Sequence, residues 1–155
     1  MMQHLQPPQE IPTLSSNLRI FLAGSIDNGK AENWQAKFVE AFADKPITFL
    51  NPRREDWNPE LEPTLDNPDF EEQVRWEMQG LEVADFIVMY FAPDSKAPIS
   101  LLELGLFASS GRMLVCCPEG YWRKGNVDFV CRKFSIPTFS NLDELIIAAG
   151  AYVKL

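Results

Sequence analysis

The sequence predicts a single α/β domain built on a doubly wound parallel sheet. Four short apolar runs, each about the length of a strand, alternate with segments of helical periodicity. The runs cover residues 18–24, 47–51, 84–91 and 112–118. They do not alternate strictly between apolar and polar residues, as expected for parallel strands that are buried on both faces. Strands that alternate with helices favour a flavodoxin-like or Rossmann-like sheet of about five strands.

The segments between the runs carry the spacing of amphipathic helices, with apolar residues about every four positions. Helices are expected at 31–43, 70–83, 99–110 and about 141–149. Asp69 and Asn141 are the expected N-caps of the second and fourth helices, and Gly111 can end the third. The stretch 51–70 holds four prolines and predicts a long loop. A loop of this length is either a structured lid or a surface excursion.

Length and composition limit the class of protein. The chain has 155 residues, of which 46% are hydrophobic and 23% charged, and this suits one soluble domain with its own core. A net charge of −8 argues against nucleic acid as the main partner, because phosphate binding needs a basic face. No run reaches the roughly 18 apolar residues of a membrane helix. Residues 1–17 lack a signal core and are expected to be a flexible tail before a domain at 18–155 of a cytoplasmic protein.

Few side chains are suited to metal or redox chemistry. Cys116, Cys117 and Cys131 form neither a disulfide framework nor a CxxC motif, so they are interpreted as core thiols, with a reactive cysteine as the alternative. The single histidine, His4, lies in the tail, which argues against histidine catalysis or a metal centre in the domain. Neither GxGxxG nor a P-loop is present, so no nucleotide cofactor is predicted.

Ligands of open parallel sheets bind beyond the carboxyl ends of the strands. Gly24 and Ser25 follow the first predicted strand, and Arg53 follows the second. Gly24 would let a ligand approach the backbone closely, or it makes only a tight turn. Arg53 and Arg54 could bind a phosphate, or they form salt bridges with the acidic residues that follow them.

Two glutamates interrupt apolar faces of predicted helices. Glu103 stands among aliphatic residues in "PISLLELG", and Glu77 falls within the inner stripe of the helix before it. Because an unpaired buried carboxylate is costly, each either pairs with a cation such as Arg75 or Lys96 or serves the chemistry of the protein. Glu103 lies near a helix N-terminus, where the dipole favours an ionised carboxylate, and this suits a nucleophile.

The stretches "IFLAGSI", "QVRWEMQGLEVADFIVMYF" and "ISLLELG" stand in an order that resembles the nucleoside 2-deoxyribosyltransferase family and its nucleotide N-glycosidase relatives. The resemblance covers about residues 18–118 and implies a flavodoxin-like fold. It also implies that Glu103, in E-L-G, is the nucleophile. Glu77, eight residues before Asp85, matches the sugar-binding acid of the family, which is often an aspartate and so one methylene shorter.

Other roles carry over less directly. The transferases usually have an aspartate six residues before the nucleophile that protonates the leaving base. This chain has Ala97 there, so Asp94 takes the role or the role is absent. The hydrolase relatives have phosphate-binding Ser and Gly before the nucleophile, whereas this chain has only Ser95 and Ser100, in a different register. The family often borrows an asparagine from a neighbouring subunit, which implies a homo-oligomer; Asn126 is the candidate, with a turn asparagine as the alternative.

The chemistry that the resemblance implies is cleavage of an N-glycosidic bond. Cleavage passes through an oxocarbenium-like sugar, which a carboxylate can stabilise and capture covalently. A free nucleobase that attacks the glycosyl–Glu103 intermediate gives transfer, whereas water gives hydrolysis. Three functions are therefore open: a 2-deoxyribosyltransferase acting on nucleosides, an N-glycosidase acting on nucleoside 5′-monophosphates, and a non-catalytic nucleotide-binding module.

Overall fold

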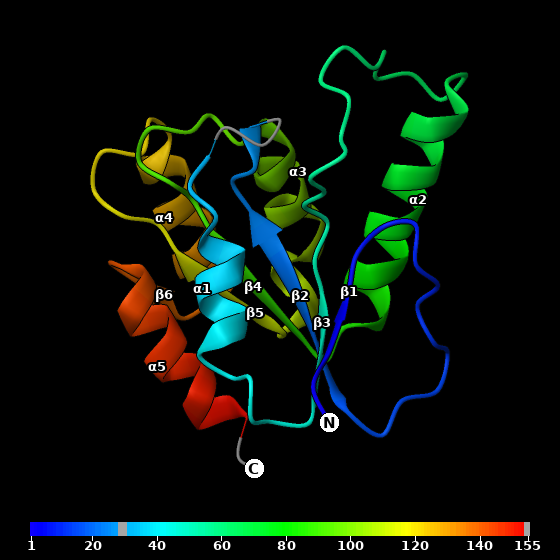
Figure 1. The fold of residues 1–155 in the computed structure, drawn as a ribbon. Helices are drawn as coiled ribbons and strands as arrows, with labels where there is room; N and C mark the ends of the chain where they lie inside the picture. The colour runs from blue at the N-terminus through cyan, green and yellow to red at the C-terminus, as the bar shows by residue number, and fades with distance from the viewer. Residues whose placement is uncertain (28–30, 154–155) are drawn as a thin grey trace.

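A computed structural model describes residues 1–27 and 31–153, and within them six parallel strands form one sheet (Figure 1). The order across the sheet is β1 (Gln3–Leu5), β3 (Ile47–Leu50), β2 (Leu18–Gly24), β4 (Phe86–Tyr90), β5 (Met113–Cys116) and β6 (Thr138–Phe139). The predicted α/β class is confirmed, and the four apolar runs form the four inner strands. The edge strands β1 and β6 have only 3 and 2 residues, too few to stand out as apolar runs.

Helices cover both faces of the sheet. They are α1 (Trp34–Glu40), α2 (Pro68–Val83), α3 (Pro98–Phe107), α4 (Lys124–Lys133) and α5 (Leu142–Tyr152), with a 3₁₀ turn η2 (Ala108–Ser110) after α3. α1 and α5 lie on one face, and α2, α3 and α4 lie on the other (Figure 1). None of the helices in the described ranges is long and apolar enough to cross a membrane. α4 was not predicted, because it buries only Val127 and Cys131 between charged residues.

The helix boundaries confirm two of the three expected caps. The side chain of Asn141 accepts a hydrogen bond from the amide of Glu144 at the start of α5 (2.9 Å), and Gly111, with φ 71°, ends the turn after α3. The prediction of Asp69 as the cap of α2 is wrong. Asn67 caps this helix by accepting from the amide of Asp69 (3.1 Å), and Pro68 then occupies the first helical position, where its missing N–H costs nothing.

The N-terminal residues, expected as a flexible tail, instead form an ordered edge of the sheet. β1 pairs with β3, whose outer backbone groups would otherwise face solvent. The carbonyl of Gln9 accepts a hydrogen bond from Trp76 Nε1 of α2 (2.8 Å), and Ile11 is 2% exposed in the core beneath. One buried isoleucine and backbone pairing hold this segment, and neither produces the apolar run that marks a strand in the sequence.

The order of the strands reverses at β2, and this places the site. β3 lies on one side of β2 and β4 lies on the other, so the loops that leave β2 and β4 diverge toward opposite faces of the sheet. The loop after Gly24 leads to α1, and the loop after Tyr90 leads to α3. A reversal of this kind opens a crevice at the carboxyl ends of the two strands.

Candidate active site

Gly24 and Ser25 join β2 to β4 at the floor of the crevice. Gly24 has φ 131°, and a Cβ there would lie 2.2 Å from the carbonyl oxygen of Tyr90. The amide of Ser25 donates to the same carbonyl (2.9 Å), and its hydroxyl accepts from the amide of Ala92 (2.9 Å). Ser25 is fully buried. The tight strand junction therefore accounts for both residues, and their contact with a substrate stays a prediction.

Glu77 lies on the face of α2 that packs against the domain. The buried residues of α2 are Gln73, Trp76, Gly80 and Leu81. This corrects the expected stripe at 70, 74, 78 and 81, of which only Leu81 is fully buried. The buried face of α2 is therefore centred near Glu77, which is one residue after Trp76 and four after Gln73. The carboxylate is partly buried.

Glu103 is also partly buried, on the flank of α3 that includes the buried Ser100. The aliphatic residues expected to surround it lie on the adjoining flank of the helix, which faces outward. Ile99, Leu102 and Leu106 are 59%, 60% and 55% exposed. α3 is apolar on both sides, so spacing alone could not tell its inner face from its outer face.

The two glutamates form an electrostatic pair. Burial, and to a smaller extent the charge of Glu77, raises the pKa of Glu103 to about 8. Burial raises the pKa of Glu77 to about 7, opposed by a hydrogen bond that Gln73 Nε2 donates to Glu77 Oε1 (3.2 Å). Like charges that approach in a site of low dielectric disfavour each other's ionisation. The pair therefore retains protons near neutral pH.

Neither glutamate has the cationic partner that the sequence allowed. Among the residues that the structure describes, no ion pair includes Glu77 or Glu103; Arg75 instead pairs with Glu71, and Lys96 lies over the ring of Trp122. The expectation that the helix dipole keeps Glu103 ionised is also wrong. Glu103 is the sixth residue of a helix that begins at Pro98, beyond the first turn in which the dipole acts.

Asp94, the candidate acid, is exposed in the loop between β4 and α3. Its charge acts on Tyr90, whose pKa is raised mainly by burial and further by Glu32, Cys116 and Asp94. In the described part of the chain, no hydrogen bond or ion pair connects Asp94 to Glu103. The structure thus places Asp94 in the loop after β4 without a described contact to Glu103, and its role as the acid stays a prediction.

Arg53 and Arg54 have different partners after β3. Arg54 forms two hydrogen bonds with Asp56 (2.9 and 3.0 Å), as the salt-bridge alternative predicted. The guanidinium of Arg53 instead donates to the carbonyls of Glu32 (2.9 Å) and Ala31 (2.7 Å), just before α1. Arg53 therefore holds the loop after β2 against the end of β3, and its contact with a phosphate stays a prediction.

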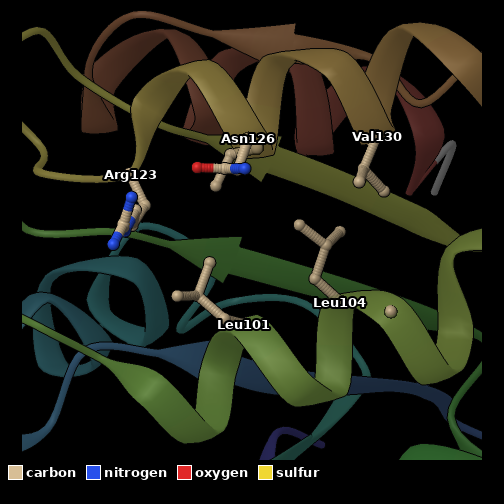
Figure 2. Close-up of a pocket in the computed structure, with 7 residues that line it drawn as sticks. Leu101, Leu104, Arg123, Asn126 and Val130 are labelled. Carbon is tan, nitrogen blue, oxygen red and sulfur yellow. The ribbon is translucent and has the colours of Figure 1, made fainter.

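Asn126 lies apart from the carboxylate pair. It is exposed on α4 and lines a pocket of about 320 Å³ between α3 and α4, where Leu101 and Leu104 face Val130 (Figure 2). Neither Glu77 nor Glu103 lines this pocket. No hydrogen bond of the described residues connects Asn126 to Glu103, and a role of Asn126 in the site of a neighbouring subunit stays a prediction.

A parallel α/β domain with a pair of carboxylates at the carboxyl edge of its sheet defines the class of protein. The sequence matches the family described as "Nucleoside 2-deoxyribosyltransferase like" over residues 17–121, and the chain belongs to this family. The resemblance seen in the sequence is thereby confirmed. The family points to small-molecule partners, namely nucleosides or nucleobases.

A comparison with solved structures supports the fold independently. The chain is similar to a conserved protein from Enterococcus faecalis V583, with a TM-score of 0.62, over 88% of this chain and 99% of that chain. The two sequences are 12% identical, so this likeness concerns the fold alone. A search of the curated proteins found no match.

Proposed function

We propose that the protein cleaves the N-glycosidic bond of a (deoxy)nucleoside and transfers the sugar to a second nucleobase, with Glu103 as the nucleophile. One observation carries this proposal. Two partly buried glutamates from different helices, Glu77 and Glu103, interact, and no ion pair of the described residues neutralises either of them. Such a pair is costly for a fold, and a positively charged transition state would stabilise it.

In the proposed reaction, the Glu103 carboxylate forms a bond to the anomeric carbon as the bond from that carbon to the base nitrogen breaks. The electrons of the broken bond go to the leaving base, which takes a proton from Asp94 or from solvent. A second nucleobase then attacks the anomeric carbon through a ring nitrogen, loses its N–H proton to Asp94 or to solvent, and releases the Glu103 carboxylate. Glu77 would accept a hydrogen bond from a sugar hydroxyl or orient Glu103.

The raised pKa of Glu103, about 8, gives this mechanism a pH dependence. The nucleophile has to be ionised, so in the free enzyme the active fraction rises as pH rises toward about 8. We therefore expect kcat/KM to increase with pH across the neutral range. A profile that is flat between pH 6 and 8.5, measured with substrate well below KM, would contradict ionisation of Glu103 as a required step.

A homo-oligomer in which Asn126 reaches the site of a neighbouring subunit is part of the proposal. Large apolar side chains are exposed along α3 and beside or on α4: Ile99, Leu102, Leu106, Trp122 and Phe129. An exposed apolar surface of this extent is typical of a protein interface. A second copy of the chain would cover it and would bring a second Asn126 to the outer side of α3.

The alternatives are an N-glycosidase acting on nucleoside 5′-monophosphates and a non-catalytic nucleotide-binding module. The first would gain from a cation for the phosphate, but the guanidinium of Arg53 is bound to backbone carbonyls and that of Arg54 to Asp56. The second gives no account of the uncompensated carboxylates. The geometry therefore favours the transferase.

The test is incubation of the purified protein with deoxyinosine and either free adenine or cytosine, followed by chromatography. Wild type should form a new deoxynucleoside, and Glu103→Ala should lose about a thousandfold or more in rate. Glu82→Ala, which removes an exposed glutamate of α2, should keep the rate. Free hypoxanthine without exchange would indicate hydrolysis instead. No turnover of nucleosides or of nucleotides would overturn the proposal in favour of the binding module.

A further inference from the structure

Gln73 is a buried glutamine whose side-chain amide binds Glu77. It lies on α2, four residues before Glu77, and is 7% exposed. Its Nε2 donates to Glu77 Oε1 (3.2 Å) and to the carbonyl of Pro52 (3.1 Å). Pro52 comes two residues after the end of β3. The amide therefore joins the carboxylate to the carboxyl edge of the sheet.

The orientation of this amide is fixed by its donors. Gln73 Oε1 is buried and has no hydrogen-bond partner among the described residues. The reversed orientation would turn this oxygen toward two acceptors, the Pro52 carbonyl and the Glu77 carboxylate, and would repel both. A buried acceptor without a partner lowers stability, and an apolar side chain of similar volume would avoid that loss. Compared with such an apolar side chain, the amide of Gln73 contributes the two hydrogen bonds that it donates.

We propose that Gln73 is a positioning residue for Glu77, because its amide fixes the Glu77 carboxylate to the backbone just beyond the end of β3. The inference rests on the proposed function only in giving Glu77 a role in the reaction. Gln73 itself need not touch the substrate. In the sequence, Gln73 is distinguished only by its i, i+4 spacing from Glu77.

The charged groups around Glu77 leave this task to Gln73. The cations on the surrounding elements are Arg53 and Arg54 after β3 and Arg75 of α2, and β1 adds the titratable His4. The guanidinium of Arg53 donates to the carbonyls of Ala31 and Glu32 just before α1, that of Arg54 binds Asp56 and that of Arg75 binds Glu71, while His4 Nε2 is 3.0 Å from Asn51 Nδ2. The acidic groups of α2 and α3, which are Asp69, Glu71, Glu72, Glu82 and Glu103, cannot favour the charged form of Glu77. The Gln73 amide is thus the described contact that lowers the pKa of Glu77.

The test follows the side-chain carboxyl carbon of Glu77 by NMR as the full chain is titrated. In Gln73→Met, the midpoint of Glu77 should rise by about one pH unit, because a hydrogen bond to the charged form is lost. Gln79→Met is the matched control, since it alters an exposed glutamine of the same helix, and its midpoint should stay at the wild-type value. Glu77→Gln identifies the resonance by its disappearance. A folded Gln73→Met with an unchanged midpoint would overturn the inference.

A second variant replaces Gln73→Met in the titration if that protein does not fold. If Gln73→Met does not give a dispersed spectrum, Gln73→Asn keeps a buried amide but withdraws it by one methylene from both acceptors, and it should shift the midpoint in the same direction. The part of the kcat/KM profile near pH 7, which ionisation of Glu77 governs, should shift to higher pH with the midpoint, and a merely structural role for Gln73 would not cause this shift. If wild type turns over no nucleoside, the proposed function fails, while the NMR titration still decides the role of Gln73.

Discussion

Charged side chains have different partners at the two ends of the strands, the amino edge and the carboxyl edge of the sheet. At the amino edge, Asp85 accepts a hydrogen bond from the amide of Arg19 (2.8 Å) and lies 3.8 Å from Arg19 Nε. Arg112, at the same edge, donates to the carbonyls of Leu81 and Ala84 at the end of α2. At the carboxyl edge, Glu77 and Glu103 approach each other, and no cation of the described residues neutralises them.

This difference separates a structural use of charge from a functional one. An exposed carboxylate beside a cation, as Asp85 is beside Arg19, costs the fold little, whereas two partly buried neighbouring carboxylates without a cation among the described residues lower stability at neutral pH. Folds keep arrangements of the second kind where a ligand supplies the missing partner. The contrast between the edges therefore supports the assignment of chemistry to the carboxyl edge, where ligands of this fold class bind.

The largest expected effect is a loss of stability on substitution of Gly24, and it tests whether this residue of the carboxyl edge has a structural role. Gly24→Ala should lower the free energy of unfolding by about 3 kcal/mol or more, because the new Cβ would collide with the Tyr90 backbone at a positive φ. Urea denaturation measures this loss. Gly125→Ala in α4 is the control, since nothing lies within 4 Å of its Cβ position. If the free energy of unfolding falls no more in Gly24→Ala than in the control, the tight strand junction does not require Gly24, and a ligand contact becomes the explanation for this glycine.

Much of the fold could be predicted from the sequence, because its signals are local. The inner strands are continuous apolar runs, and Asn141 and Gly111 act through their own backbone. The edge strands could not be predicted, because β1 is held by pairing with β3, forty residues or more away in the chain. α4 was missed because two buried residues do not make a periodic pattern.

The site could be predicted only in part, for a related reason. Glu77 and Glu103 each stand out as a charge on an apolar helix, but their mutual interaction depends on how α2 and α3 pack. Spacing also misjudged which face of α3 is buried, since Leu102 and Leu104 are equally apolar and only one is inside. Gln73 carries no charge and no motif, so its two hydrogen bonds are visible only in three dimensions.

The second prediction concerns the free energy of unfolding that is lost when Glu103 ionises in the folded chain. The pKa of Glu103 is raised from 4.5 to about 8, so between these values the folded chain binds more protons than the unfolded chain. The contribution of Glu103 to stability therefore falls as pH rises from about 4.5 to about 8. Glu103→Gln lacks this fall and should be more stable than wild type by about 2–4 kcal/mol at pH 9, while it loses activity.

Urea denaturation at pH 4 and pH 9 measures the difference between the two proteins. The gain of Glu103→Gln should be present at pH 9 and absent at pH 4, where the carboxyl is protonated in both states. Glu72→Gln, at an exposed position of α2, should show no such pH-dependent gain. Equal pH dependence in wild type and Glu103→Gln would mean that Glu103 is neutralised by a partner, and the contrast between the edges would be lost.

The smallest expected effect has the opposite sign, at the amino edge. Asp85→Ala should lower the free energy of unfolding by about 1 kcal/mol, because it removes the acceptor of the Arg19 amide and leaves Arg19 Nε, a buried atom with no hydrogen bond, without its nearby carboxylate. Denaturation in urea should show this loss at pH 7, and the rate of sugar transfer should stay at the wild-type value. Removal of a carboxylate would then destabilise one edge of the sheet and stabilise the other. If Asp85→Ala instead abolished transfer in a folded protein, the division of the sheet into a structural edge and a catalytic edge would be wrong. A substitution just before β4 would then have changed the reaction at the other end of that strand.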